Sequence, residues 1–421
     1  MKEIIELLKS NAQVSDYKIT IHNKESYELF FVKGKLETLR CTDTCDKEVT
    51  VYADHDGCKG EAQFFVYPST TADDAKKLIA EAVEKALLIN NQPFDLPAAE
   101  EGKFAVASDF QNYSLAELAG LISKTVFETN TLPGASLNSV EVFVNKHTDE
   151  ILNSRGLHKT QTRYDAMVEA IPTYNGEKQS VELYEQYNFS SLDLAAFRRE
   201  IAGKLEQVKA RYEAIQPKVP LSCPVVLNIQ EVSELMREFA WDLNYASVYS
   251  HSNLFKKGDA IQKEILGDPI SITMAGQVPG SIRSRCFDED GLSLGSIRLV
   301  EDGKVLNYYG GNRYGQYLKE TPTGNLTCLC AAPGTAQLPQ GSWLEVVSMS
   351  GLQVDMYNDY IGGEIRLAYH HTPEGVLPLT GISFSGSLTD ALSKIRFSTE
   401  SATHGGYHGP VMAVLEDMKI F

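Results

Sequence analysis

Apolar and polar residues alternate with the two-residue period of a β-strand through much of the first half of the chain. The alternating segments are residues 17–22, 26–32, 35–40, 48–52 and 60–67. Turn-forming residues, such as Lys33-Gly34 and the segment Asp54–Gly57, separate neighbouring segments. Strands that follow one another through tight turns pair antiparallel, so this pattern predicts an antiparallel sheet.

Helical periodicity interrupts the strands at several places in the same half. A short amphipathic stretch covers residues 2–8, and a longer one opens at Ser69–Asp74 and continues to about Ile89. Ser or Thr can cap that second helix, and the acidic residues of its first turn suit the positive end of the helix dipole. A third helix is predicted from about Ser114, after which strands return at residues 140–145, 150–153 and 166–171.

The clearest domain boundary follows a long helix predicted over Leu192–Ile215. Pro217 and Pro220 come directly after it, and neither residue can extend a helix. We therefore predict an N-terminal domain over residues 1–217, in which helices pack on the antiparallel sheet.

Residues 218–421 contain one clear helical stretch, from about Gln230 to Ala246, followed by strands and glycine-containing turns. This second domain is predicted to be mostly antiparallel β-structure. The chain as a whole is therefore predicted to have an α+β fold.

Charge and composition exclude several classes of protein. Among 421 residues, 39 Lys and Arg against 56 Asp and Glu give a net charge of −17, which disfavours direct binding to the backbone of DNA or RNA. No run reaches the ~18–20 apolar residues of a membrane span, and acidic residues interrupt the apolar N-terminal stretch, unlike a secretory signal. Seven cysteines are too few for a disulfide framework, so we expect reduced thiols in a cytoplasmic protein.

The candidate chemistry is concentrated in the helix around Arg237, because the common sequence motifs of serine hydrolases, nucleotide-binding proteins and His-Glu-x-x-His peptidases are missing. Glu234, Glu238 and Asp242 follow one another at four-residue spacing on its polar side. Such a column of like charges destabilises a helix slightly unless something compensates. Two interpretations remain open: a solvated face with Arg237 as counter-ion, or an acidic pair that borders a cleft.

Several short strings, in order along the whole chain, resemble the TldD/TldE (PmbA) family, also described as modulators of DNA gyrase. They are Glu25-Ser26, Gly57 with Gly60, Ile151–Gly156, Arg285–Gly291, Thr323–Asn325, Leu344–Gly363 and Gly386–Ile395. Each string is weak alone, and their collinear order carries the resemblance.

The resemblance implies that this chain lacks the ligands of the family's metal site. In this family TldD is a zinc metallopeptidase with a His-Glu-x-x-x-His helix and a cysteine ligand near the C-terminus, whereas TldE is its metal-free partner. In the matching helix the motif segment here begins with Arg237, keeps Glu238 and ends with Asp242, and the segment matching the cysteine contains His404 but no cysteine. A guanidinium cannot coordinate zinc. The chain therefore resembles TldE, with no metal or other cofactor and no intrinsic peptidase activity expected.

A different metal site could use His404 and His408 together with Glu238 or Asp242. Residues four apart share a face only on a helix, however, and Gly405-Gly406 between the histidines favours a loop. A glycine-rich turn with surface histidines is the preferred interpretation.

The resemblance implies a non-catalytic subunit that partners a TldD-like zinc peptidase and acts on unfolded peptides. We expect a homodimer in isolation, and binding of extended peptide by its addition to a sheet edge. Two alternatives stay open: a self-sufficient homodimeric hydrolase that uses Glu238 or Asp242 as base, and a peptide-binding scaffold without a peptidase partner.

Overall fold

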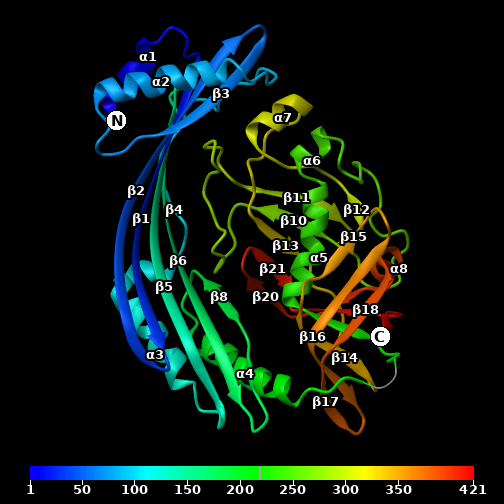
Figure 1. The fold of residues 1–421 in the computed structure, drawn as a ribbon. Coiled ribbons are helices and arrows are strands. Elements are labelled where there is room, and N and C mark those ends of the chain that lie inside the picture. The colour runs from blue at the N-terminus through cyan, green and yellow to red at the C-terminus, as the bar shows by residue number, and fades with distance from the viewer. Residues whose placement is uncertain (218–219) are drawn as a thin grey trace.

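The computed structural model describes residues 1–217 and 220–421, whose strands form three sheets of eight, six and nine strands (Figure 1). All strands of the eight-stranded sheet lie between residues 16 and 189, and the strands of the other two sheets lie between residues 225 and 420. The predicted α+β class is confirmed. The predicted domain boundary after residue 217 stays a prediction, and residues 218–219 beside it lie outside the described residues.

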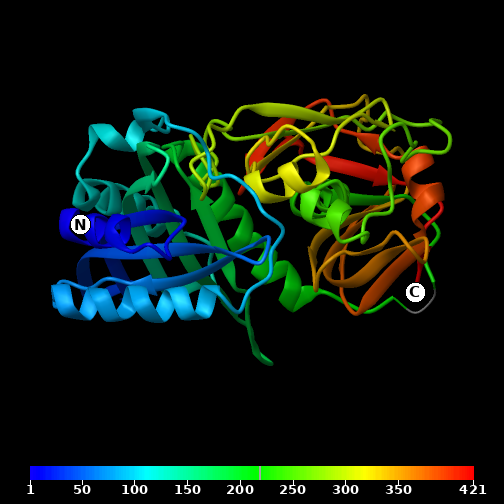
Figure 2. The same ribbon diagram turned by 90° about the horizontal axis from the view of Figure 1, so that it is seen from above.

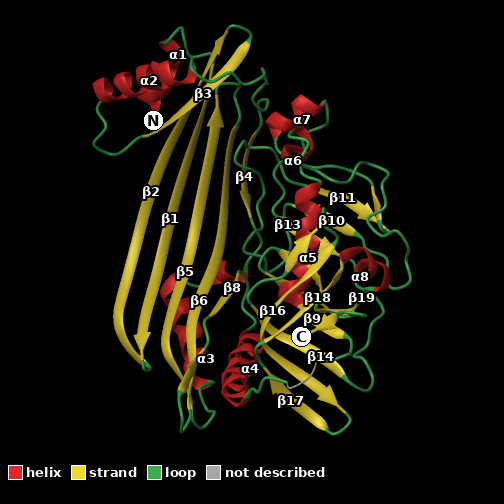
Figure 3. Ribbon diagram, turned by 45° about the vertical axis from the view of Figure 1, so that its right-hand side comes forward, coloured by secondary structure: helices red, strands yellow, loops and turns green. Residues whose placement is uncertain are grey.

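The N-terminal sheet is built on four long strands, which run side by side in Figure 3. The strand order is β3-β2-β1-β5-β6-β4, and β7 and β8 also pair with β6. The strands are β1 Asp16–Val32, β2 Lys35–His55, β3 Cys58–Phe65, β4 Glu101–Ala105, β5 Ala135–Asn153, β6 His158–Asn175, β7 Ser180–Glu182 and β8 Glu185–Phe189. Most pairs are antiparallel, as predicted, and β4 pairs parallel with β6.

The prediction of separate short strands was wrong for the longest elements. Residues 17–22 and 26–32 belong to one strand, β1, and residues 35–40 and 48–52 belong to one strand, β2. The first part of β2, up to Asp46, is almost entirely exposed. An apolar pattern cannot mark a strand segment that buries neither face, which is why the sequence suggested a break.

Helices cover one face of this sheet at its two ends, with α1 and α2 at one end and α3 and α4 at the other (Figure 1). The helices are α1 Lys2–Ser10, α2 Ala72–Ala86, the short 3₁₀ helix η1 Asp109–Asn112, α3 Leu115–Glu128 and α4 Leu194–Glu213. Thr71 and Ser114 begin α2 and α3 with capping boxes, because each hydroxyl accepts from a backbone N–H that lies three residues later. The predicted ends at Ile89 and Ile215 are each a few residues too late.

The main core of the C-terminal half lies between two sheets and two helices, beside the long strands (Figure 2). The six-stranded sheet contains β10 Ile272–Ala275, β11 Ser296–Glu301, β12 Lys304–Val305, β13 Cys328–Ala331, β20 Ser401–His404 and β21 Tyr407–Pro410. The nine-stranded sheet contains β9 Val225–Asn228, β14 Trp343–Met349, β15 Gln353–Asp355, β16 Tyr360–Thr372, β17 Gly375–Leu379, β18 Ile382–Ser387, β19 Arg396–Phe397, β22 Met412–Leu415 and β23 Lys419–Ile420. The helices are α5 Ile229–Asp242, α6 Tyr245–Tyr249, α7 Asn312–Leu318 and α8 Leu388–Lys394.

The predicted single helix from Gln230 to Ala246 is two helices, α5 and α6. The Asn244 side chain accepts from the backbone N–H of Ala246 at 2.9 Å and so begins the second helix. No helix in the described ranges combines the length and the apolar character that a membrane crossing requires.

Candidate functional site: the polar side of helix α5

Helix α5 is held by a cap and by a continuous apolar stripe. The Asn228 side chain accepts from the N–H of Gln230 at 2.8 Å, and its amide also lies within 3.3 Å of the backbone oxygens of Val346 and Val347. The stripe predicted from the sequence is fully buried: Val232, Leu235, Met236, Phe239, Ala240 and Leu243. The helix therefore presents a fixed polar side, on which the candidate residues stand.

Arg237 and Glu238 lie half-buried on this side. Within the described residues Arg237 makes no ion pair, so it is not the close counter-ion that one interpretation of the sequence proposed. Glu234 instead accepts from the backbone N–H of Leu352 at 3.1 Å. Burial raises the pKa of Glu238, and the nearby charge of Glu234 raises it further.

Asp242, at the end of α5, has a structural role. Its Oδ1 accepts from the N–H of Leu254 at 2.6 Å and its Oδ2 from the N–H of Phe255 at 3.0 Å. Burial raises the pKa of Asp242, while these two hydrogen bonds oppose that rise. Both oxygens hold the loop that follows α6, which makes this carboxylate poorly suited to act as a base.

The hairpin of β20 and β21 brings His404 to the same region, because Gly405, with φ of 57°, allows the tight turn. His404 pairs directly with Tyr407, and Thr403 pairs with His408. Directly paired residues of antiparallel strands project to the same face, and successive residues alternate. Tyr407 is buried in the core that includes the α5 stripe, so His404 faces α5 and His408 faces the opposite way. The two histidines therefore cannot bind one ion together.

His404 stands at the meeting point of the two halves of the chain. Its side chain is exposed, yet desolvation by the surrounding protein lowers the pKa of its imidazole. The charges of Glu185 and Glu234 act to raise that pKa, and those of Arg237 and Lys204 act to lower it. Lys204 of α4 is itself paired with Glu185 of β8 at 2.6 Å.

The structure thus brings Arg237, Glu238 and His404 to one region and commits Asp242 to the adjacent loop. In the ranges that the structure describes, no three His, Cys, Asp or Glu side chains group in a way that could hold a metal ion. A half-buried cation, a carboxyl group and an imidazole can bind polar groups of a ligand. They do not make a zinc-ligand set.

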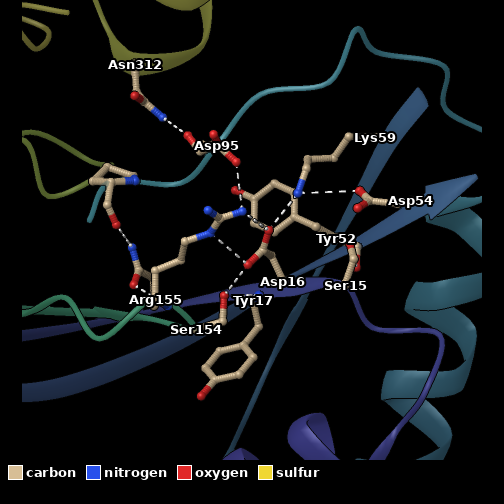
Figure 4. A network of polar contacts seen from close by, with 12 residues as sticks. Ser15, Asp16, Tyr17, Tyr52, Asp54, Lys59, Asp95, Ser154, Arg155 and Asn312 are labelled. Carbon is tan, nitrogen blue, oxygen red and sulfur yellow. Dashed lines mark hydrogen bonds and ion pairs between the residues drawn. The ribbon is translucent and has the colours of Figure 1, made fainter. Parts of the chain in front are cut away.

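A buried network of charges fixes the end of the N-terminal sheet beside the C-terminal half (Figure 4). Lys59 donates to Asp16 at 2.6 Å, and both side chains are buried. Ser154 donates to the same carboxylate at 2.6 Å, and Arg155 approaches it at 3.3 Å. Burial alone would raise the pKa of Asp16, but these partners lower it on balance.

The network continues across the junction through Asp95. The Arg155 guanidinium lies 2.8 Å from the Asp95 carboxylate, and the Asn312 side chain of α7 donates to the Asp95 backbone oxygen at 2.7 Å. A second connection is the pair between Lys18 of β1 and Asp290, at 2.7 Å. These contacts set the position of the sheet relative to the domain that carries α5.

Three of the strings that carried the family resemblance meet at this junction. Residues 151–156 provide Ser154 and Arg155, and residues 285–291 provide Asp290. The backbone N–H of Asn325, in the third string, donates to Asp288 at 3.0 Å. Asp290 pairs with Lys18 of the other half, whereas Ser154 and Arg155 contact residues of their own half, as does Asn325.

Sequence analysis missed three of these groups. Glu231 precedes the residues singled out on α5; it is buried, and one of its carboxylate oxygens has no partner within the described ranges. Lys204 and Asp16 carry no local signal, because their partners lie far away along the chain. Such pairs can be recognised only in the folded structure.

Comparisons with known proteins identify what the chain is similar to. Residues 220–420 match the family model described as the PmbA/TldA metallopeptidase C-terminal domain. No curated protein matches the chain.

Solved structures match it along its full length. TldE from Thermococcus kodakarensis is 14% identical, with a TM-score of 0.79 over 100% of this chain and 99% of that one. A proposed modulator of a DNA gyrase from Thermotoga maritima is 16% identical, with a TM-score of 0.77 over 100% and 99%. A proposed modulator of DNA gyrase from Bacteroides thetaiotaomicron is 14% identical, with a TM-score of 0.77 over 100% and 97%. The chain therefore has the fold of TldE, and its C-terminal half belongs to the PmbA/TldA metallopeptidase C-terminal domain family.

Proposed function

We propose that this chain is a metal-free subunit of the TldE type, which assembles with a TldD-like zinc peptidase and helps to hold unfolded peptide for it. The observation that carries the proposal is the state of helix α5. Arg237 stands where the resemblance places the first zinc ligand, and Asp242, at the place of the second, has both oxygens engaged by backbone N–H groups. Neither side chain is free to bind zinc.

The hairpin supports the same proposal, because its segment Thr403–His408 has no thiol and its two histidines face opposite ways. The subunit would take part by positioning peptide rather than by cleaving it. An extended peptide that adds to a sheet edge uses main-chain hydrogen bonds, which tolerate many sequences. A cytoplasmic location and a homodimer in the absence of the partner subunit belong to this proposal.

The family name concerning DNA gyrase fits an indirect effect better than direct binding to nucleic acid. A net charge of −17 repels the phosphate backbone. We propose that any effect on gyrase passes through peptides that act on gyrase. The alternative of a self-sufficient hydrolase is less well supported. Both carboxylate oxygens of Asp242 accept hydrogen bonds from backbone N–H groups. Within the described ranges, no set of metal ligands lies beside Glu238.

The purified chain is expected to bind no zinc tightly and to leave unfolded casein uncleaved, because it lacks the ligands that would lower the pKa of a bound water. Elemental analysis after dialysis is the measurement, with the assay repeated after addition of a purified TldD-like subunit. A ratio of about one zinc ion per chain would contradict the proposal. Co-purification with a stoichiometric zinc-bearing paralogue would support the assembly.

A triple variant, Arg237→His with Asp242→His and His404→Cys, is expected to gain measurable zinc affinity but little turnover. The side chains from α5 and the inner face of the hairpin would then supply ligands, while catalysis requires placement to within about 0.5 Å. Titration against a zinc-binding dye gives the affinity. The matched control carries His404→Ala in place of His404→Cys, which removes the third ligand and keeps both α5 substitutions. A triple variant that binds zinc no better than the wild type would show that α5 is not the counterpart of the metal helix, whereas equal affinity in the control would show only that residue 404 supplies no ligand.

A further inference from the structure

The Arg237 guanidinium carries a positive charge that its own chain does not neutralise. The side chain is half-buried, and within residues 1–217 and 220–421 it makes neither an ion pair nor a side-chain hydrogen bond. A guanidinium has five N–H donors and cannot be deprotonated in a protein. Partial burial removes water from those donors, which costs free energy unless another group replaces the water. An anion bound at Arg237 would supply that replacement.

The acidic side chains around Arg237 are engaged with other groups. Glu234 accepts from a backbone N–H of the loop before β15 at 3.1 Å, and Glu185 of β8 is paired with Lys204 at 2.6 Å. Glu238 follows Arg237 by one position, which places it about 100° further around the helix. Because these carboxylates are engaged or turned away, the guanidinium donors stay open to a ligand.

His404 adds a second hydrogen-bonding group beside Arg237. The hairpin of β20 and β21 packs against α5, with His404 on the side that faces the helix (Figure 1). Burial lowers the pKa of His404, and the charge of Arg237 lowers it further, so the two side chains lie close enough for their charges to interact. An anion between them would receive N–H donors from both.

Trp241 provides an apolar surface on the same side of α5. Its side chain is 66% exposed, and it follows Arg237 by four positions. Residues four apart lie above one another on a helix, and long side chains lean toward the preceding turn. The indole therefore lies over the turn that carries Arg237, where its ring can pack against the apolar part of a ligand.

From these observations we propose that Arg237, His404 and Trp241 form a site for a carboxylate group of an unfolded peptide. The guanidinium would bind both carboxylate oxygens through parallel N–H donors, the imidazole would donate a further hydrogen bond, and the indole would contact the neighbouring peptide side chain. This inference rests on the proposed function and names the part of the peptide that the subunit recognises. The carboxylate can be the C-terminus of the peptide or an Asp or Glu side chain, because both have the same chemistry.

Binding of labelled peptides to the full-length chain tests the site, since all three side chains belong to one chain. The probe is a short unstructured peptide of glycine, serine and leucine, followed by fluorescence anisotropy. It is used with a free C-terminal carboxylate, with a C-terminal amide, and with the amide and one internal glutamate. The amide is expected to bind ~10-fold or more weakly than the free acid. Recovery through the internal glutamate would show that the site accepts side-chain carboxylates, and no recovery would show that it requires the C-terminus.

Variants of Arg237 connect this preference to the site. Arg237→Gln removes the charge and should abolish the difference between free acid and amide. Arg237→Lys should retain part of it, because lysine keeps the charge but lacks the paired donors. The matched control is Arg198→Gln, whose guanidinium is exposed and paired with Glu128 of α3 at 3.2 Å, and it should bind like the wild type. Unfolding curves show that each variant is folded.

Trp241 also reports where the peptide binds. The chain has two tryptophans, and Trp343 is buried and stacked on His371, with 3.8 Å between ring centroids. A shift of tryptophan emission on binding of the free acid is therefore expected from Trp241.

Equal affinity for free acid and amide, or a preference that survives Arg237→Gln, would overturn the carboxylate site and leave the proposed function standing. Failure of all three peptides to bind would overturn both the site and the peptide-holding part of the proposed function. Assembly with a TldD-like subunit is tested separately by co-purification.

Discussion

Replacing Asp16 by alanine is expected to lower the free energy of unfolding by about 3–5 kcal/mol, because it leaves a buried ammonium without its counter-charge. Lys59 is only 3% exposed and donates to Asp16 at 2.6 Å. Ser154 and Arg155 lose the same acceptor. Denaturant unfolding followed by circular dichroism gives the measurement.

The matched control is Asp54→Ala. Asp54 also approaches Lys59, at 3.4 Å, but its side chain is 59% exposed. Water already screens that pair, so its removal should change stability by ~1 kcal/mol or less. Similar losses in the two variants would mean that Lys59 finds another partner and that the network is not the source of stability.

The same network predicts a dependence on pH. The pKa of Asp16 is lower in the folded protein than in the unfolded chain, so its stabilising contribution is complete above the unfolded value. That contribution is lost as the pH falls through the lowered pKa of the folded state. The wild type should therefore lose more stability on acidification than Asp16→Asn does.

Glu231→Gln is expected to stabilise the protein by about 2–4 kcal/mol at pH 9 and to have a much smaller effect near pH 5. Burial raises the pKa of Glu231 to about 8, and the charge of Glu234 contributes to the rise, while Lys204 opposes it. Between the unfolded value, near 4.5, and 8 the folded state holds a proton that the unfolded chain has released. Stability therefore falls as the pH rises through this window.

Thermal or denaturant unfolding at pH 5, 7 and 9 measures this effect. Glutamine keeps the shape of the protonated acid and cannot ionise, so the slope between pH 5 and 8 should decrease in the variant. The control is Glu84→Gln on the exposed side of α2, where no change of slope is expected. An unchanged slope in Glu231→Gln would mean that water or a neighbour solvates the Glu231 carboxylate in the folded state.

The capped helices were predictable because their signals are local. Thr71 and Ser114 begin helices with capping boxes, and the apolar stripe of α5 is buried as its spacing predicted. The alternation in residues 17–32 likewise predicted antiparallel pairing, which the register of β1 with β2 confirms. Each of these features depends on residues within a few positions of one another.

The lengths of the strands were not predictable in the same way. Strand β2 continues through residues that bury neither face, because pairing with β1 holds it in place. Likewise, the role of Asp242 at the end of α5 depends on the N–H groups of Leu254 and Phe255, which a loop supplies to its carboxylate. In both cases the outcome depends on backbone groups from a distant part of the chain. A local sequence pattern contains no information about those groups.

By itself the sequence determined the α+β class, the helix caps and the apolar stripe of α5, whereas the assignment of Arg237 and Asp242 to ligand positions of the family stays a prediction. The tertiary structure alone decided that Asp242 holds a loop, that His404 faces α5 while His408 does not, and that Glu231 is buried with an unpaired oxygen. It also decided that Asp16, Lys59 and Arg155 meet. The physical reason is range: propensity and periodicity act along the chain, whereas hydrogen bonds and burial of charge depend on which distant segments the folded chain brings together.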